Sequence, residues 1–135
     1  MAHTQVIFVN LPVLDLAKSE AFYRAIGFEK NEQFSDDTAI CMTLSNAIGV
    51  MLLTHPKWQS FTTKSIPNSQ LSAQTLLAIS RPSRDSVNAM VEAGKASGGK
   101  ADPNPTQDFG FMYGRSLEDP DGHIWEPFWM DENVG

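Results

Sequence analysis

Gln5–Leu11, with the sequence QVIFVNL, is a strand-like run that precedes an amphipathic helix ending at Gly27. Its β-branched and aromatic residues favour a strand, and the apolar residues that follow at helical spacing favour a helix. The same order returns when Thr75–Ser80 (TLLAIS) leads into a second amphipathic helix that reaches Gly94. Two such units in 135 residues predict two curved sheets, and curved sheets that pair enclose a cleft.

Each unit carries signals for the ends of its helix. Asp15 and Ser83 stand where N-caps are expected, and glycines follow each helix. The buried stripes are predicted at Ala21, Phe22, Ala25 and Ile26 in the first helix, and at Val87, Met90 and Val91 in the second. The first helix is followed by three predicted strands, Phe28–Phe34, Thr38–Leu44 and Gly49–Thr54. The second is followed by an edge segment or loop over Ala101–Asp108, a strand over Phe109–Leu117, a tight turn over 119–122 and a closing strand over Ile124–Met130.

The segment 55–73 lies between the two units and shows no clean period. It has two interpretations. It is either a solvated linker or a mobile flap that brings Trp58 or Phe61 to a pocket, because long loops often carry binding residues.

Composition limits the classes of partner. A net charge of −6 argues against nucleic acid and against anionic membranes, and no apolar run is long enough to span a bilayer. The first residues lack the basic head and apolar core of a signal peptide, so a cytoplasmic protein is expected. Cys41 is the single cysteine, which excludes an intrachain disulfide, and it is predicted to be a buried structural thiol.

Two motifs carry a resemblance to a known family. The run 10–16 (NLPVLDL), with Ser19, Phe22-Tyr23 and Gly27-Phe28 after it, and the closing run 119–126 (DPDGHIWE) resemble the vicinal oxygen chelate superfamily. That group contains glyoxalase I, bleomycin-resistance proteins and extradiol dioxygenases, and the chain looks most like its small bacterial glyoxalase-like members. The resemblance implies an α+β fold of two βαβββ modules whose curved mixed sheets surround a cleft, usually in a homodimer. On this basis we expect one domain with modules at about 4–54 and 74–131, joined by 55–73.

The resemblance also implies four metal-ligand positions, typically His or Gln, Glu, His and Glu. In this sequence they fall on Phe8, Leu52, Thr75 and Glu126, with the register at Leu52 uncertain by one residue. One carboxylate among apolar neighbours would hold a divalent ion weakly. We therefore predict no metal and no other cofactor, which argues against metal-dependent lyase or dioxygenase chemistry.

Glu126 is the candidate catalytic residue. It lies on a strand of large apolar residues, so its carboxylate needs a partner or a raised pKa. It would act as a general base or fix a bound ligand; alternatively it pairs with Arg115 or with the backbone.

The candidate ligand-binding residues are more scattered. Arg115 and Tyr113 share a strand face, and Arg115 would suit a carboxylate or phosphate, although a surface or dimer-edge cation is the alternative. His55 is either an acid or base near the mouth of the cleft or an exposed loop residue. The complete ligand-binding set is Phe8, Asn10, Leu52, Trp58, Thr75, Tyr113, Arg115 and Phe128.

Two functions follow. The first is binding of a small organic molecule in an apolar cleft without chemistry, in the style of bleomycin-resistance proteins. The alternative is a glyoxalase-like lyase or isomerase of the lactoylglutathione lyase type, with Glu126 as its base.

Overall fold

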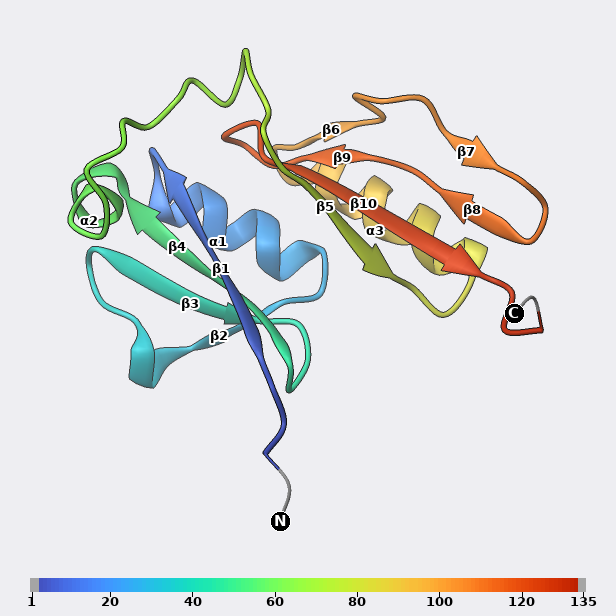
Figure 1. Ribbon diagram of the computed structural model, residues 1–135, viewed down its shortest axis with the longest axis horizontal. Coiled ribbons are helices and arrows are strands. Elements are labelled where there is room, and N and C mark those ends of the chain that lie inside the picture. The colour runs from blue at the N-terminus through green and yellow to red at the C-terminus, as the bar shows by residue number, and fades with distance from the viewer. Residues whose placement is uncertain (1–2, 134–135) are drawn as a thin grey trace. The chain divides into compact units, whose positions relative to one another are not determined.

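The computed structural model describes residues 3–133, and the chain divides into two compact units, Met1–Asn68 and Ser69–Gly135. Each unit contains one sheet with a helix against one of its faces (Figure 1). Within the described residues, no helix is both long and apolar enough to cross a membrane.

The first unit follows the order strand, helix, three strands. Its elements are β1 (Ile7–Val13), α1 (Leu16–Ala25), β2 (Glu29–Asn31), the 3-10 helix η1 (Glu32–Phe34), β3 (Ala39–Thr43), β4 (Ile48–Thr54) and α2 (His55–Gln59). The sheet order is β1-β4-β3-β2, with β1 parallel to β4 and the other pairs antiparallel.

The second unit repeats that order with interrupted strands. Its elements are β5 (Leu76–Ser80), α3 (Arg84–Ala96), β6 (Lys100–Ala101), β7 (Gln107–Asp108), β8 (Met112–Gly114), β9 (Leu117–Glu118) and β10 (Ile124–Met130). β10 lies parallel to β5 on one side and antiparallel to β8 and β9 on the other, with β7 and β6 outside them. The predicted α+β fold of two βαβββ modules is confirmed, because the two sheets share one strand order.

The buried face of α1 differs from the predicted stripe. The Asp15 carboxylate caps the helix by accepting from the Lys18 backbone N–H at 3.1 Å, and Gly27 ends the turn with φ of 113°. Ala21 and Ala25 are exposed, whereas the buried residues are Ser19, Phe22, Tyr23 and Ile26. Those four follow helical spacing, and the Tyr23 ring meets the rings of Phe22 and Phe28 edge to face at 5.0 and 5.3 Å. The predicted buried face of α1 is therefore rotated by about one residue from the observed one, because the prediction counted Ala21 and Ala25 as buried apolar residues.

The second helix matches its prediction closely. The Ser83 hydroxyl accepts from the Ser86 backbone N–H at 3.0 Å, which caps α3. Val87, Met90 and Val91 are buried as predicted. The helix ends at Ala96 with Gly94 buried inside it, and Gly98 follows with φ of 97°.

Two predicted strands are shorter than expected. The strand predicted over Phe28–Phe34 ends at Asn31, whose side chain accepts from the Gln33 backbone N–H at 3.1 Å and starts η1. The strand predicted over Phe109–Leu117 becomes β8 and β9, and Gly110 has φ of 80° ahead of them.

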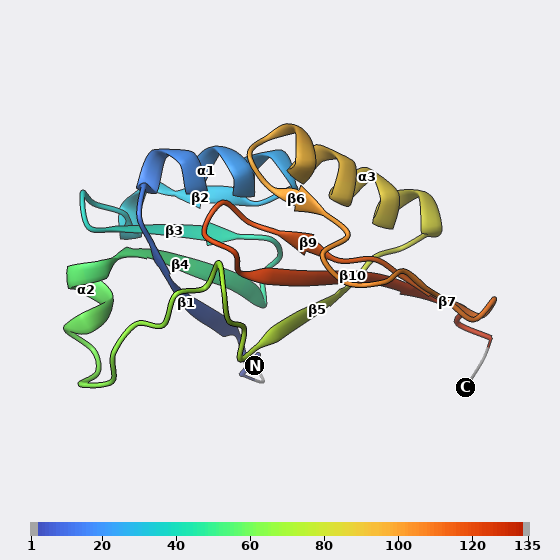
Figure 2. The same ribbon diagram turned by 90° about the horizontal axis from the view of Figure 1, so that it is seen from above.

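The segment 55–73 contains a helix that the sequence did not predict. Thr54 caps α2 by accepting from the Lys57 backbone N–H at 3.3 Å, and Pro56 lies in the first turn, where it costs no hydrogen bond. α2 packs against β1 and β4, on the side of the sheet away from α1 (Figure 2), and Leu53 in β4 is only 1% exposed.

The end of the same segment is fixed to the second unit. The Ser69 hydroxyl donates to the Asp121 carbonyl, and the Gln70 amide donates to the Pro120 carbonyl at 2.8 Å. Gly122 has φ of 93°, and a side chain there would collide with the Ser69 carbonyl.

Candidate functional site

In the first unit, strand alternation separates a core face from a second face. Leu11 and Val13 of β1 are 6% and 1% exposed on the face toward α1, whereas Phe8 and Asn10 are exposed on the face opposite α1. In the β1–β4 ladder, Phe8 pairs with Gly49 and Asn10 pairs with Met51. Met51 therefore shares the face of Phe8, and Gly49 leaves room for the Phe8 ring, which a side chain there would strike.

That register corrects the prediction for Leu52. Leu52 pairs with Leu11 and is 0% exposed, so it belongs to the core beside α1 and does not reach the opposite face. Met51 takes its expected place, within the one-residue uncertainty that the sequence left open.

The turn after β2 brings a second aromatic ring to the same face. The Ser35 hydroxyl donates to the Asn31 carbonyl at 2.7 Å and accepts from the Cys41 backbone N–H at 3.0 Å. These bonds fix η1 beside β3 and place Phe34, which is 62% exposed, at its end.

One Asp36 carboxylate oxygen closes the same turn. It accepts from the backbone N–H and hydroxyl of Thr38 and from the Ala39 backbone N–H, at 2.8 to 3.0 Å. These hydrogen bonds, chiefly that from the Thr38 backbone, lower the pKa of Asp36.

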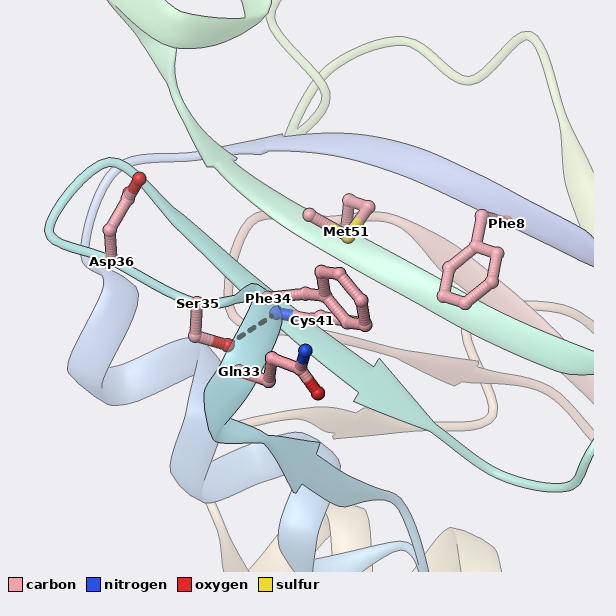
Figure 3. Close-up of a pocket in the computed structure, with 7 residues that line it drawn as sticks. All are labelled: Phe8, Gln33, Phe34, Ser35, Asp36, Cys41 and Met51. Atoms are coloured by element: carbon pink, nitrogen blue, oxygen red, sulfur yellow. Dashed lines mark hydrogen bonds between the residues drawn. The ribbon is translucent and has the colours of Figure 1, made fainter.

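A pocket of about 520 Å³ lies on this face of the first unit. Figure 3 shows the Phe8 ring, the Phe34 ring and the Met51 side chain around it, with the Asp36 carboxylate pointing away. The lining residues are Phe8, Gln33, Phe34, Ser35, Asp36, Cys41 and Met51. The volume lies within the ordinary range for small-molecule sites, and the rings and thioether offer apolar contact with few polar groups.

Cys41 is buried, as predicted, and burial raises the pKa of its thiol. A thiol held in its neutral form is a poor nucleophile and a poor metal ligand. Its part in the pocket is apolar contact.

In the second unit, β10 separates its faces in the same way. Trp125 and Pro127 are buried, and Glu126 and Phe128 lie half-buried on the face opposite α3. A smaller pocket of about 190 Å³ lies there, and both of these residues line it. The other lining residues are Ala78, Asn104, Pro105, Gln107, Met112, Gly114, Arg115, Ser116 and Pro127.

Thr75 does not lie beside the carboxylate. β5 begins one residue later, and the β5 residue paired with Glu126 is Ala78. The nearest β5 side chain to Glu126 across the ladder is therefore the methyl group of Ala78.

Tyr113 and Arg115 face α3. The Tyr113 hydroxyl donates to the Asn88 amide oxygen at 2.6 Å, and the Arg115 guanidinium donates to the same oxygen at 3.0 Å. Arg115 also forms two hydrogen bonds with Asp102, at 3.0 and 2.7 Å, and these raise the pKa of Arg115 and lower that of Asp102. The guanidinium therefore ties α3 to the sheet, and it does not pair with Glu126.

The remaining predicted residues lie outside both pockets. Asn10 is exposed beside the first pocket without lining it, and Trp58 is half-buried in α2. His55 begins α2 and is half-buried. Sequence reasoning missed Gln33 and Phe34 because it interpreted 28–34 as one continuous strand. The turn residues Ser35-Asp36-Asp37 after an aromatic residue were the available signal.

Part of the sequence matches a known protein family, and the fold of nearly the whole chain matches solved structures. Residues 5–45 match the family model for bleomycin resistance protein-like N-terminal domains. No curated protein matches the chain.

Solved structures share its fold almost from end to end. The S. aureus protein SA1046 is 25% identical, with 95% of each chain covered and a TM-score of 0.76. A glyoxalase-related enzyme from Fulvimarina pelagi is 23% identical over 94% of this chain and 88% of its own, with a TM-score of 0.77. TnmS3, an antibiotic binding protein from Streptomyces sp. CB03234, is 17% identical over 97% of this chain and 99% of its own, with a TM-score of 0.66.

Proposed function

We propose that this chain, which has the fold of the glyoxalase/bleomycin resistance/dioxygenase proteins, binds a small planar organic molecule without chemical change. The pocket of about 520 Å³ in the first unit, with Phe8, Phe34 and Met51 around it, carries the proposal. Aromatic rings prefer stacked or edge-to-face neighbours, and two phenylalanines across one hollow offer both to a flat ligand.

The chemistry of the available donors supports binding over metal-assisted catalysis. The resemblance assigns metal ligands to Phe8, Leu52, Thr75 and Glu126, and the strand register puts Met51, not Leu52, on the face of Phe8. One carboxylate and one soft thioether do not fit a divalent ion that prefers nitrogen and oxygen ligands. Within residues 3–133, no three His, Cys, Asp or Glu side chains come together to complete a set.

The family match adds support of a general kind. The matched model describes bleomycin resistance protein-like domains, and TnmS3 is an antibiotic binding protein. Both point to sequestration of an organic compound, although at such identity TnmS3 shares only the fold with this chain.

A matched pair of variants tests the pocket. Phe8→Ala should weaken binding of a planar aromatic probe such as 2-naphthol about 5-fold or more, since the ring contact alone contributes about 1 kcal/mol beyond the buried area. Phe111→Ala is the control. Phe111 is exposed to the same extent as Phe8, 44% against 43%, but it lies in the second unit, away from this pocket. Titration calorimetry on both variants measures the difference. Equal affinities for the two variants, or no binding by the wild type across a panel of planar aromatics, would refute the proposal.

A glyoxalase-like lyase or isomerase with Glu126 as base is the alternative, because that carboxylate lines the second-unit pocket. Formation of lactoylglutathione, with and without Ni²⁺ or Zn²⁺, distinguishes the two functions. Turnover that Glu126→Gln abolishes would favour the lyase, and binding without product favours sequestration.

We also propose that the chain forms a homodimer. The β1 end carries three exposed apolar side chains in a row, with Val6, Ile7 and Phe8 at 53%, 60% and 43% exposure. β1 is an edge strand of its sheet, and an edge strand that exposes apolar side chains can pair with a second copy of the chain. Sedimentation equilibrium should give twice the monomer mass; a monomer at all concentrations would refute the dimer.

A further inference from the structure

We infer that the pocket of the second unit is a binding site for an organic ammonium group, with the carboxylate of Glu126 as its counter-ion. The pocket lies in a different unit from the one proposed to hold the planar ligand, so each can be tested without the other.

The first step is that the Glu126 carboxylate has no partner among the described residues of its own unit. Among residues 3–133, no cationic side chain forms an ion pair with the Glu126 carboxylate, and no donor forms a hydrogen bond with that carboxylate. Arg115, the cation in the same pocket lining, directs its guanidinium to Asp102 and Asn88 on the α3 side. A half-buried carboxylate with no partner is an acceptor that a bound cation would satisfy.

The second step concerns the surroundings of that carboxylate. Phe128 lies two residues along the same strand on the same face, and its ring can attract a cation through its π-system. Asn104 and Gln107 line the pocket as well, and their amide oxygens are neutral acceptors. An ammonium group has several N–H donors and no acceptor, so this combination suits it better than an alcohol.

Size narrows the ligand further. A volume of about 190 Å³ is below the range for whole drug-sized molecules, so the pocket fits a head group with a short hydrocarbon or ring attached. Ala78, Met112 and Gly114 supply apolar contact for that part. A bare divalent ion is a poor fit, because Glu126 is the one carboxylate among the lining residues and its charge would balance only half of the charge of the ion.

The charge of the unit favours the same ligand. Residues 69–135 contain five Lys and Arg against ten Asp and Glu, whereas residues 1–68 contain five against six. Almost all of the net charge of −6 therefore belongs to the unit with the pocket. Such a field attracts cations and repels anions.

The experiment compares three probes of one shape. Benzylamine, benzyl alcohol and benzoate are titrated at pH 7 while amide shifts are followed by two-dimensional NMR. Benzylamine should shift the amides of Ala78, Gly114 and Phe128 and bind about 10-fold or more tightly than benzyl alcohol, because hydrogen bonds to charged groups are the stronger ones. Benzoate should leave those amides unchanged.

Two variants locate the effect. Glu126→Gln keeps the shape of the side chain and should weaken benzylamine about 10-fold while changing benzyl alcohol less than about twofold. Glu118→Gln removes the same charge from β9 of the same sheet, outside the pocket lining, and should weaken benzylamine far less than Glu126→Gln does while leaving benzyl alcohol unchanged.

The inference is overturned if benzylamine and benzyl alcohol bind equally, if no shift appears at millimolar benzylamine, or if Glu126→Gln keeps the preference for the amine. Shifts that map only outside the pocket overturn it as well. If Glu126→Gln does not fold, the wild-type comparison of amine with alcohol decides the question by itself.

Discussion

At the scale of single residues, the shape of the first pocket depends on a missing side chain. Gly49 stands opposite Phe8 in the ladder, and a Cβ there would strike the Phe8 ring and lie 3.0 Å from the Met42 carbonyl oxygen. The ring can turn away, but the carbonyl belongs to the sheet and cannot. A methyl group at this position is therefore an overpacking change that also displaces a pocket wall.

We predict that Gly49→Ala lowers the free energy of unfolding by about 1–3 kcal/mol and weakens binding of planar aromatics. Urea denaturation and calorimetry measure the two effects. Gly114→Ala is the matched control in the other unit, because its Cβ would meet Phe128 and Pro127 at ordinary contact distances of 3.5 and 3.6 Å. Equal stability losses in the two variants would contradict the role given to Gly49.

Another residue-scale prediction concerns Asp108. The Arg84 guanidinium makes two hydrogen bonds to its carboxylate, at 3.0 and 2.9 Å, and with the Gly110 backbone N–H it lowers the pKa of Asp108 to about 2. Since the folded-state pKa lies below the ordinary 3.8, the ion pair stabilises the protein above that pH. That contribution is lost as pH falls from about 4 towards about 2.

Carbon-13 NMR titration of the side-chain carboxyl should report this low pKa directly. Arg84→Gln should raise the pKa of Asp108 part of the way to 3.8, because the Gly110 hydrogen bond remains. Asp102, whose pKa is lowered by Arg115, should not move. An unchanged Asp108 titration in the variant would show that the guanidinium is not the cause.

At the scale of elements, the register of β4 decides which side chains are core and which belong to the site. Leu52 lies toward α1 and Met51 toward the pocket. We predict that Leu52→Ala costs about 2–5 kcal/mol of unfolding free energy, the range for a leucine deleted from a core. Met51→Ala should cost less and should weaken binding of planar aromatics.

Denaturation and calorimetry on the two variants separate the possible registers. A shift of one residue would exchange the two results, because successive side chains on a strand point to opposite faces. Larger destabilisation by Met51→Ala would therefore disprove the register.

The elements themselves were largely predictable from the sequence, and the sites were not. Asp15, Ser83 and Gly27 act locally, so their capping and stop signals could be recognised without knowing the fold. Placement across a sheet depends on pairing between distant strands. Alternation along one strand could show that Glu126 and Phe128 share a face, but the exclusion of Leu52 and Thr75 required the ladder partners.

The same reason explains two features of the binding residues that the sequence could not show. Tyr113 and Arg115 share a strand face, as predicted, but only the contact with Asn88 of α3 shows which face that is. Phe34 reaches the first pocket because the turn at Asn31 redirects the chain. A local side-chain bond there overrides a strand-like sequence.

At the scale of the whole molecule, one topology occurs twice with different contents. Both sheets place the first strand parallel to the last, and each unit has a pocket on the sheet face opposite its longer helix, α1 or α3. The first pocket has two aromatic rings and a thioether, and the second has a carboxylate beside one ring. The two units thus share a scaffold, and the residues on one face of each sheet give their pockets different linings.

The uneven charge of the two halves gives the last prediction. With ten acidic and five basic residues in the second unit, part of the attraction for an ammonium ligand comes from charges that do not touch it. Raising the salt from about 10 mM to about 1 M shortens the screening length from about 30 Å to about 3 Å, which screens the attraction of distant charges and leaves the contact with Glu126.

Benzylamine should therefore bind a few-fold more weakly in high salt, benzyl alcohol should be unaffected, and part of the preference for the amine should persist. NMR titrations at both salt concentrations measure this. A preference that vanishes entirely in high salt would mean that the general field of the unit, and not the carboxylate in the pocket, attracts the amine.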